Sequence, residues 1–381
     1  MNFFAQLENF KEPVNLKDTH HLLVILGTLV IFLAIPLTVT LVQQSREPKS
    51  RAETIPNDPL FLRTNELDQW SLRKIRAPEA WDITTGSRSI KVAIVSDGVW
   101  ADHEDLKDNL IAGYAVPGTN LDMQVSTIGA GIIGAVGNNS LGIAGINWQV
   151  SMMPVRALDT SGGTCRLEAF VEGIRWAVDN GAQIIQSDLY FCENELNPDP
   201  SLKAAFDYAL DRGVIVVAPY DAPSWPVRYP ADYPGVIGVG STDQDDVVTF
   251  FSATGPGLDL VAPGYIILST VPAANLYAGT AGNSVAVSHV AGVLALLLAR
   301  EVSPKNAVQA IYNGALDLGT PGRDDTYGYG RVDACGALNA AGFICPATAG
   351  DTLSPTVNIT NPTGGQIISG TVNVNVNATD N

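Results

Sequence analysis

Histidine and cysteine are scarce in this chain, whose 381 residues include only four of each. No CxxC or HExxH motif occurs, so the spacing of these residues gives no sign of a zinc chelate. Basic residues are also few: 22 Lys and Arg stand against 39 Asp and Glu, for a net charge of −17. This balance disfavours a nucleic-acid partner, because binding to a phosphate backbone needs clustered positive charge.

Charged residues make up 16% of the chain and hydrophobic residues 46%, which is typical of a packed globular body. One segment, residues 22–42, has no charge at all and is long enough to cross a hydrocarbon layer about 30 Å thick. It is longer than the apolar core of a cleavable signal peptide, and no small-residue cleavage site follows it. We therefore expect an N-terminal tail (1–20) followed by an uncleaved transmembrane signal anchor (21–43).

The rest of the chain divides by composition. Residues 44–56 are polar and predict a tether, and residues 57–343 alternate short apolar runs with amphipathic stretches. Near-continuous apolar runs such as 91–96 and 213–218 are typical of strands buried on both faces of a parallel sheet. The run 284–299 is apolar on every side, which predicts a helix in the middle of the domain. The pattern indicates an α/β fold with a sheet between layers of helices.

The C-terminal segment has a different character. Residues 344–354 are rich in Pro, Thr and Gly and predict a linker, and Val372, Val374 and Val376 alternate with polar residues as in a strand. Residues 355–381 are too few for a complete β-sandwich. They resemble the start of an immunoglobulin-like module, so we expect a truncated module whose natural chain continues past Asn381.

Short motifs recur along residues 57–343 in a fixed order. They are NDP (57–59), IRAPEAWDITTGS (75–87), HEDL (103–106), GIIGAVGNNSLGIAGIN (131–147), MPVRALD (153–159), YPADYPGVIGVGSTD (229–243), LDLVAPG (258–264), SHVAGVLALL (288–297) and GYGRVDA (328–334). In this order and spacing they resemble the subtilisin-like serine proteases, in the style of thermitase-type enzymes. The resemblance implies the subtilisin-like three-layer fold with a central, mostly parallel sheet.

The resemblance also implies where the catalytic groups should stand, and most of them are replaced. The family needs a Ser nucleophile, a His base, an Asp that orients the His, and an Asn amide in the oxyanion hole. The Asp position is Ser96, the His position is Val125 and the Asn position is Ala222, so Ser284 alone remains. Asp97 does not simply replace the lost Asp, because neighbours on extended chain point to opposite sides.

No other base is evident in the cleft motifs. His103 and His289 match positions that are structural in the family, and no lysine falls in a cleft motif. A serine without a base is an ordinary alcohol, so we expect Ser284 to be a vestigial nucleophile. In the family, a strand with the sequence SLGG forms a wall of the substrate groove. The corresponding residues here are Asp188 to Phe191, and Tyr220 and Trp225 add aromatic bulk nearby. These residues predict a filled or reshaped groove.

The resemblance also implies a calcium site, and every ligand that it implies is present in the sequence. Its implied ligands are the carboxylates of Asp58 and Asp105, the side chain of Asn139, and the carbonyl groups of Val136, Leu141 and Ile143. Six oxygen ligands suit Ca²⁺. Calcium at millimolar concentration is extracytoplasmic, so we expect a single-pass membrane protein with its main domain outside, although the charges that flank the anchor do not favour this orientation.

Four cysteines allow three pairings. The resemblance places Cys165 and Cys192 on facing walls of the groove, where a bridge would close it, and leaves Cys335 and Cys345 to pair near the end of the domain.

Three functions remain open from the sequence. The favoured one is a membrane-anchored pseudoprotease that is catalytically inactive and acts as a binding or scaffold module for an unidentified protein or peptide. The second is an active subtilisin-family endopeptidase with a non-standard base. The third is a structural part of a larger, adhesin-like cell-surface protein.

Overall fold

The computed structural model describes residues 54–61, 68–119, 123–158, 166–188, 199–221, 229–272 and 276–346, together with two C-terminal strands. The chain divides into two compact units, residues 1–51 and 52–381. The first unit, and with it the expected tail and anchor, lies outside the described residues. Within the described ranges, no helix has the length and apolar character needed to span a membrane. The anchor at 22–42 therefore stays a prediction.

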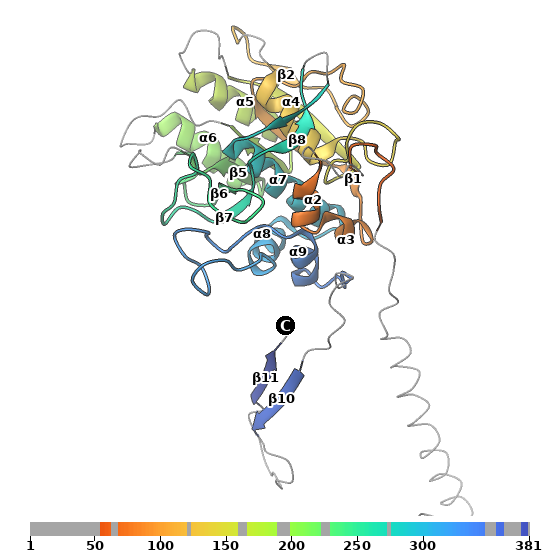
Figure 1. Cartoon of the computed structure of the whole chain (residues 1–381). Coiled ribbons are helices and arrows are strands. Elements are labelled where there is room, and N and C mark those ends of the chain that lie inside the picture. The colour runs from red at the N-terminus through yellow and green to blue at the C-terminus, as the bar shows by residue number, and fades with distance from the viewer. Residues whose placement is uncertain are drawn as a thin grey trace, which may run out of the picture. The chain divides into compact units, whose positions relative to one another are not determined.

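A seven-stranded parallel sheet forms the centre of the second unit (Figure 1). Its strands, in sheet order, are β2 (Tyr114–Ala115), β3 (Gln149–Arg156), β1 (Gly86–Ser96), β4 (Ile184–Ser187), β5 (Ile215–Pro219), β6 (Val236–Thr242) and β7 (Leu260–Pro263). Every pairing between neighbours in this sheet is parallel. The parallel sheet predicted from the near-continuous apolar runs is confirmed.

Helices cover both faces of this sheet. They are α2 (Trp70–Lys74), α3 (Ala77–Trp81), α4 (Gln124–Gly134), α5 (Leu167–Asp179), α6 (Pro200–Leu210), α7 (Asn283–Ala299), α8 (Pro304–Asn313) and α9 (Ala334–Ala340). Side chains alternate along β1, so that Val92 and Ile94 pack with α4 and α7 in one core, while Ala93 and Val95 pack with α5 and α6 in another. The result is the predicted three-layer arrangement, which can be followed in Figure 1.

Helix α7 is the predicted central helix. Fifteen of its 17 residues are buried, and only Ser284 and Ala299 at its two ends are partly exposed. Gly292 lies where the helix meets Ile146: a Cβ atom added there would be 2.8 Å from Ile146 Cδ1. An all-apolar sequence suits this position because the helix has no solvent-facing side.

Two antiparallel pairs lie outside the main sheet. One joins β8 (Ile267–Thr270) to β9 (Tyr277–Thr280). The other joins β10 (Thr356–Asn361) to β11 (Asn375–Thr379) and confirms strand structure in the C-terminal segment. The immunoglobulin-like module itself, and the exact domain boundaries, stay predictions.

A disulfide bond between Cys335 and Cys345 links α9 to the end of the domain, with the two Cα atoms 5.6 Å apart. This pairing is confirmed. The other expected pair, Cys165–Cys192, lies outside the described residues.

Candidate functional site

The end of strand β1 carries a buried carboxylate that caps a helix. Asp97 directly follows Ser96, the last residue of β1, and both side chains are fully buried. Asp97 Oδ2 accepts a hydrogen bond from the Val125 backbone N–H at 2.9 Å, and Oδ1 accepts one from the Ser126 N–H at 2.8 Å. These donors belong to the first turn of α4 and have no partner within the helix. Asp97 therefore stabilises the start of α4.

Val125 is the position at which the family resemblance places the general base. It lies in the first turn of α4, so the helix that would present an imidazole is intact. Its side chain is aliphatic and can neither accept nor donate a proton. The carboxylate beside it, Asp97, contacts the backbone of this turn and not a side-chain base.

Asp188 occupies the same edge of the sheet. It directly follows β4, which pairs in parallel with β1 through Val95 and Ser187, so that Ser96 and Asp188 end neighbouring strands. The Asp188 carboxylate accepts a hydrogen bond from Gln186 Nε2 at 3.3 Å, and the hydroxyl groups of Ser96 and Ser284 lie close enough to act on its pKa. Burial raises the pKa of Asp188 to about 7, and the negative charge of Asp97 acts in the same direction.

Ser284, the expected nucleophile, is the second residue of α7 and is half-buried. The structure places it against Asp188, a contact that the sequence motifs did not reveal. A carboxyl group thus faces the hydroxyl directly, with no imidazole between them.

Both described histidines have structural roles, as expected. His103 Nε2 lies 2.9 Å from the Leu276 carbonyl oxygen, and its ring packs edge-on against Trp100 and Tyr277. His289 is fully buried in α7, where Nδ1 lies 2.9 Å from the Val285 carbonyl oxygen. Burial lowers the pKa of His289 to about 4. In the described part of the chain, neither imidazole hydrogen-bonds Ser284.

The oxyanion position, Ala222, lies outside the described residues. Asn283 is a nearby amide that the sequence reasoning missed, and it precedes Ser284. Its Nδ2 donates to the Tyr220 carbonyl oxygen at 3.1 Å and to Asp221 Oδ1 at 2.6 Å. Both N–H bonds of this buried amide are used by the protein, so it is not free to donate to an oxyanion.

The expectation that Tyr220 narrows the groove was wrong. Tyr220 is 1% exposed, and its hydroxyl accepts a hydrogen bond from the Gly257 N–H at 3.3 Å. Its side chain shares a core with Val216 and Ala218, which lie two and four residues earlier. The twofold repeat of a strand therefore directs Tyr220 into the layer of α5 and α6. Leu189, Tyr190, Phe191 and Trp225 lie outside the described residues.

Two of the expected calcium ligands, Asp58 and Asp105, are hydrogen-bonded to the same loop. Asp58 and Asp105 are both fully buried, although they are 47 positions apart in the sequence. Asp58 accepts hydrogen bonds from the backbone N–H groups of Asn138 and Asn139 at 2.6 and 3.3 Å. Asp105 accepts them from Asn139 Nδ2 at 2.8 Å and from the Ile143 N–H at 3.0 Å. The loop over residues 136–143 thus joins the two carboxylates.

Two buried carboxylates fit a hard cation. Burial, with a smaller contribution from the negative charge of Asp58, raises the pKa of Asp105 to about 6. Among the described ion pairs, none supplies a Lys or Arg to either carboxylate. Asn139 turns Nδ2 to Asp105, while its Oδ1 accepts a hydrogen bond from the Leu141 N–H, so its oxygen does not face Asp105. No cluster of three or more His, Cys, Asp or Glu side chains in the described ranges is placed to hold a metal ion.

Comparison with known proteins identifies the family of this chain. A model of the subtilase family of peptidases matches residues 87–330. The chain belongs to the subtilase family. Thermitase from Thermoactinomyces vulgaris is 39% identical over 289 residues, which cover 74% of this chain and 99% of thermitase. A thermophilic serine proteinase from Bacillus sp. (strain AK1) is 36% identical over 74% of this chain and 69% of its own length.

A solved subtilase structure has the same fold. Fervidolysin from Fervidobacterium pennivorans, a keratinolytic enzyme related to subtilisin, has a TM-score of 0.63 and 28% sequence identity. The match covers 77% of this chain and 48% of fervidolysin. The resemblance read from the motifs is therefore confirmed, and so is the subtilisin-like fold.

Proposed function

We propose that this subtilase is a pseudoprotease: a catalytically inactive binding or scaffold module built on the peptidase fold. The observation that carries the proposal is the environment of Ser284, whose hydroxyl group lies beside the Asp188 carboxyl group and, among the described residues, has no imidazole partner. Acyl transfer by serine requires a base that takes the hydroxyl proton and later delivers it to the leaving group. Val125 supplies no such group.

A second function has one specific observation in its favour. The carboxyl group of Asp188 lies beside the hydroxyl group of Ser284, and in this alternative it would be the base of an active peptidase. Against it, Asp188 is 1% exposed and already hydrogen-bonded to Gln186, so it is poorly placed to pass a proton to a leaving group. The occupied amide of Asn283 further weakens stabilisation of an oxyanion.

Calcium is part of this proposal. The carboxylates of Asp58 and Asp105 would hold the ion, together with the carbonyl groups of Val136, Leu141 and Ile143. When bound, the ion neutralises two buried negative charges and links the N-terminal segment to the loop. This role is structural, and it matches the charge that the two carboxylates leave uncompensated.

We further propose that residues 22–42 anchor the chain in a membrane, with the main domain extracytoplasmic and available to a protein or peptide partner. The described disulfide suits an oxidising compartment. A relative from Bacillus subtilis (strain 168), 33% identical over 277 residues, is named minor extracellular protease Epr. The adhesin-like alternative rests on the segment 355–381. Capture of a partner by the chain with and without this segment distinguishes that alternative from a binding function of the main domain.

A fluorophosphonate probe tests the loss of catalysis, with thermitase as the positive control. The purified chain is expected to remain unlabelled under conditions that label thermitase completely. Labelling that disappears in Ser284→Ala would overturn the pseudoprotease proposal. Labelling that also disappears in Asp188→Asn, but persists in Asp207→Asn at a surface ion pair, would establish the carboxylate-base peptidase in its place.

A further inference from the structure

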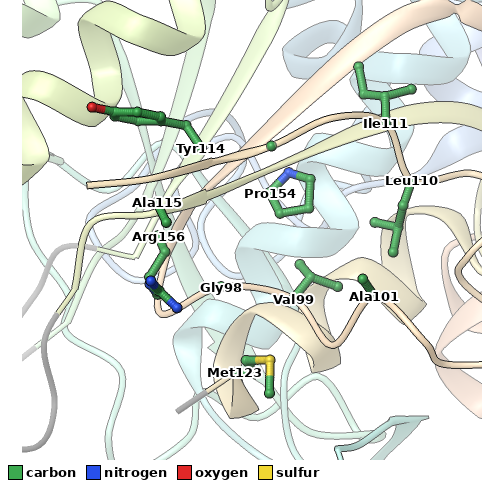
Figure 2. Close-up of a pocket in the computed structure, with 11 residues that line it drawn as sticks. Gly98, Val99, Ala101, Leu110, Ile111, Tyr114, Ala115, Met123, Pro154 and Arg156 are labelled. Atoms are coloured by element: carbon green, nitrogen blue, oxygen red, sulfur yellow. The ribbon is translucent and has the colours of Figure 1, made fainter. Parts of the chain in front are cut away.

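A pocket of about 280 Å³ opens beside the degenerate cleft (Figure 2). It is formed by the loop after β1, the chain leading into edge strand β2, the end of β3 and the residue that precedes α4. Its walls are mostly apolar, with one cationic side chain, Arg156, on its border (Figure 2). Apolar residues on this lining include Val99, Ala101, Leu110, Ala115, Met123 and Pro154, whereas Tyr114 turns its ring to Trp176 on the other face of the sheet.

The edge of the sheet forms one side of this pocket. Strand β2 contains two residues and pairs Ala115 with Arg156 at the edge of the sheet. Just before it, Gly113 has no side chain, and a Cβ atom there would lie 2.2 Å from the Pro154 carbonyl oxygen. Pro154 and Arg156 are two residues apart on β3, so both side chains lie on the same face of the sheet.

Arg156 is the residue of this pocket that indicates the charge of a ligand. The aliphatic part of its side chain passes Gly98, where an added Cβ atom would lie 3.5 Å from Arg156 Cβ and Cδ. Its Nε donates to Thr119 Oγ1 at 3.2 Å. Among the ion pairs of the described residues, Arg76 and Arg331 have carboxylate partners whereas Arg156 has none. Within the described ranges, the two Nη groups of Arg156 have no hydrogen-bond or ion-pair partner, although the chain contains 39 acidic residues.

We propose that this pocket binds a small monocarboxylate with an apolar body. A guanidinium group presents paired N–H donors that match the two oxygens of a carboxylate. A single arginine among apolar walls favours one negative charge over two, and it disfavours a cationic ligand. At about 30 Å³ per water molecule, the volume accommodates roughly nine water-sized groups, which is enough for a short acyl chain.

The pocket and the cleft share two chain segments. Gly98 directly follows Asp97, and Met123 lies two residues before Val125. A bound carboxylate would therefore contact the segments that hold the former Asp and His positions of the family, while lying outside the cleft itself. This inference goes beyond the proposed function and holds whether or not Ser284 reacts.

Titration with sodium octanoate tests the proposal, by calorimetry and by NMR of protein labelled at methionine methyl groups. We expect saturable binding that shifts the Met123 methyl resonance. Octan-1-ol, which has the same chain without the charge, should bind at least about tenfold more weakly, because charge-assisted hydrogen bonds are the stronger ones.

Variants at two arginines separate the pocket from general charge effects. Arg156→Gln should weaken octanoate binding at least about tenfold, and Arg156→Lys should have a smaller effect because the charge remains. Arg166→Gln is the matched control, since Arg166 Nη1 donates to the Pro117 carbonyl oxygen and does not line the pocket. Ala115→Trp should also reduce binding by filling the space.

Three outcomes would overturn the proposal. They are the absence of saturable binding, equal affinity in Arg156→Gln and the unmodified chain, and binding that leaves the Met123 methyl resonance unchanged. The Ala115→Trp variant keeps the test decisive if Arg156→Gln fails to fold.

Discussion

The carboxyl group of Asp188 lies beside the hydroxyl group of Ser96, where the neighbouring parallel strands β4 and β1 come to their ends. The motif resemblance predicts a carboxyl group at position 96 and a hydroxyl group at position 188. If that prediction holds, the two groups have exchanged strands in this chain. A carboxyl group remains in the cleft, but it now contacts Ser284 directly.

This exchange predicts non-additive stability. Ser96→Asp alone would add a third carboxyl group beside Asp97 and Asp188 and should destabilise the fold. The double variant Ser96→Asp/Asp188→Ser restores the number of buried carboxyl groups and should recover much of the loss. We expect a favourable coupling on the order of 1–3 kcal/mol between the two sites, measured by urea unfolding of all four proteins. Additive effects would show that the two side chains do not interact.

The raised pKa of Asp188 predicts a pH-dependent contribution to stability. The native state keeps its proton to about pH 7, whereas the unfolded chain loses it near pH 4. The stabilisation by this proton is therefore complete below about pH 4 and is lost as the pH rises through about 7. Burial raises the pKa of Asp105 and Asp259 as well, so the wild type must be compared with Asp188→Asn.

In that comparison, the free energy of unfolding of the wild type should fall relative to Asp188→Asn between pH 4 and pH 7. Thermal melts of the two proteins across this range measure the difference. Asp207→Asn, which alters a partly exposed ion pair with Lys203, serves as the control and should run parallel to the wild type. Parallel curves for Asp188→Asn would contradict a raised pKa at Asp188.

Calcium should stabilise the fold through Asp58 and Asp105. A cation present at 100 times its Kd raises the free energy of unfolding by about 2.7 kcal/mol, so melts in calcium should lie above melts in EGTA. Asp58→Asn and Asp105→Asn should each abolish this difference, while Asp207→Asn should keep it. Binding should weaken below about pH 6 as Asp105 gains a proton. Identical wild-type melts with calcium and with EGTA would rule the site out.

The Cys335–Cys345 disulfide should contribute measurably to stability. The two cysteines are 10 residues apart in the sequence. Closing a loop of this length lowers the entropy of the unfolded chain, which stabilises the fold by about 2–3 kcal/mol. The variant Cys335→Ser/Cys345→Ser should lose this amount in urea unfolding under non-reducing conditions. It leaves Cys165 and Cys192 untouched, unlike a reducing agent. An unchanged unfolding midpoint would contradict the contribution.

Much of the fold was predictable because burial patterns are local in sequence. Continuous apolar runs marked β1 and β5 as strands covered on both faces, and the all-apolar stretch after Ser284 marked the central helix α7. Tyr220 shows the limit of this approach. Its motif position suggested the groove, but the alternation of β5 placed its ring in the core on the opposite side.

In the cleft, some features follow from the sequence and others from the tertiary structure. The sequence alone predicts that Val125 and Ser96 stand where the family places its His and Asp, because each of them falls inside a motif of fixed spacing. Only the tertiary structure decided that Asp97 caps α4, that Asp188 meets Ser284, and that Arg156 borders an apolar pocket. The physical reason is that residues distant in the chain meet where parallel strands end together, and no local pattern specifies those contacts.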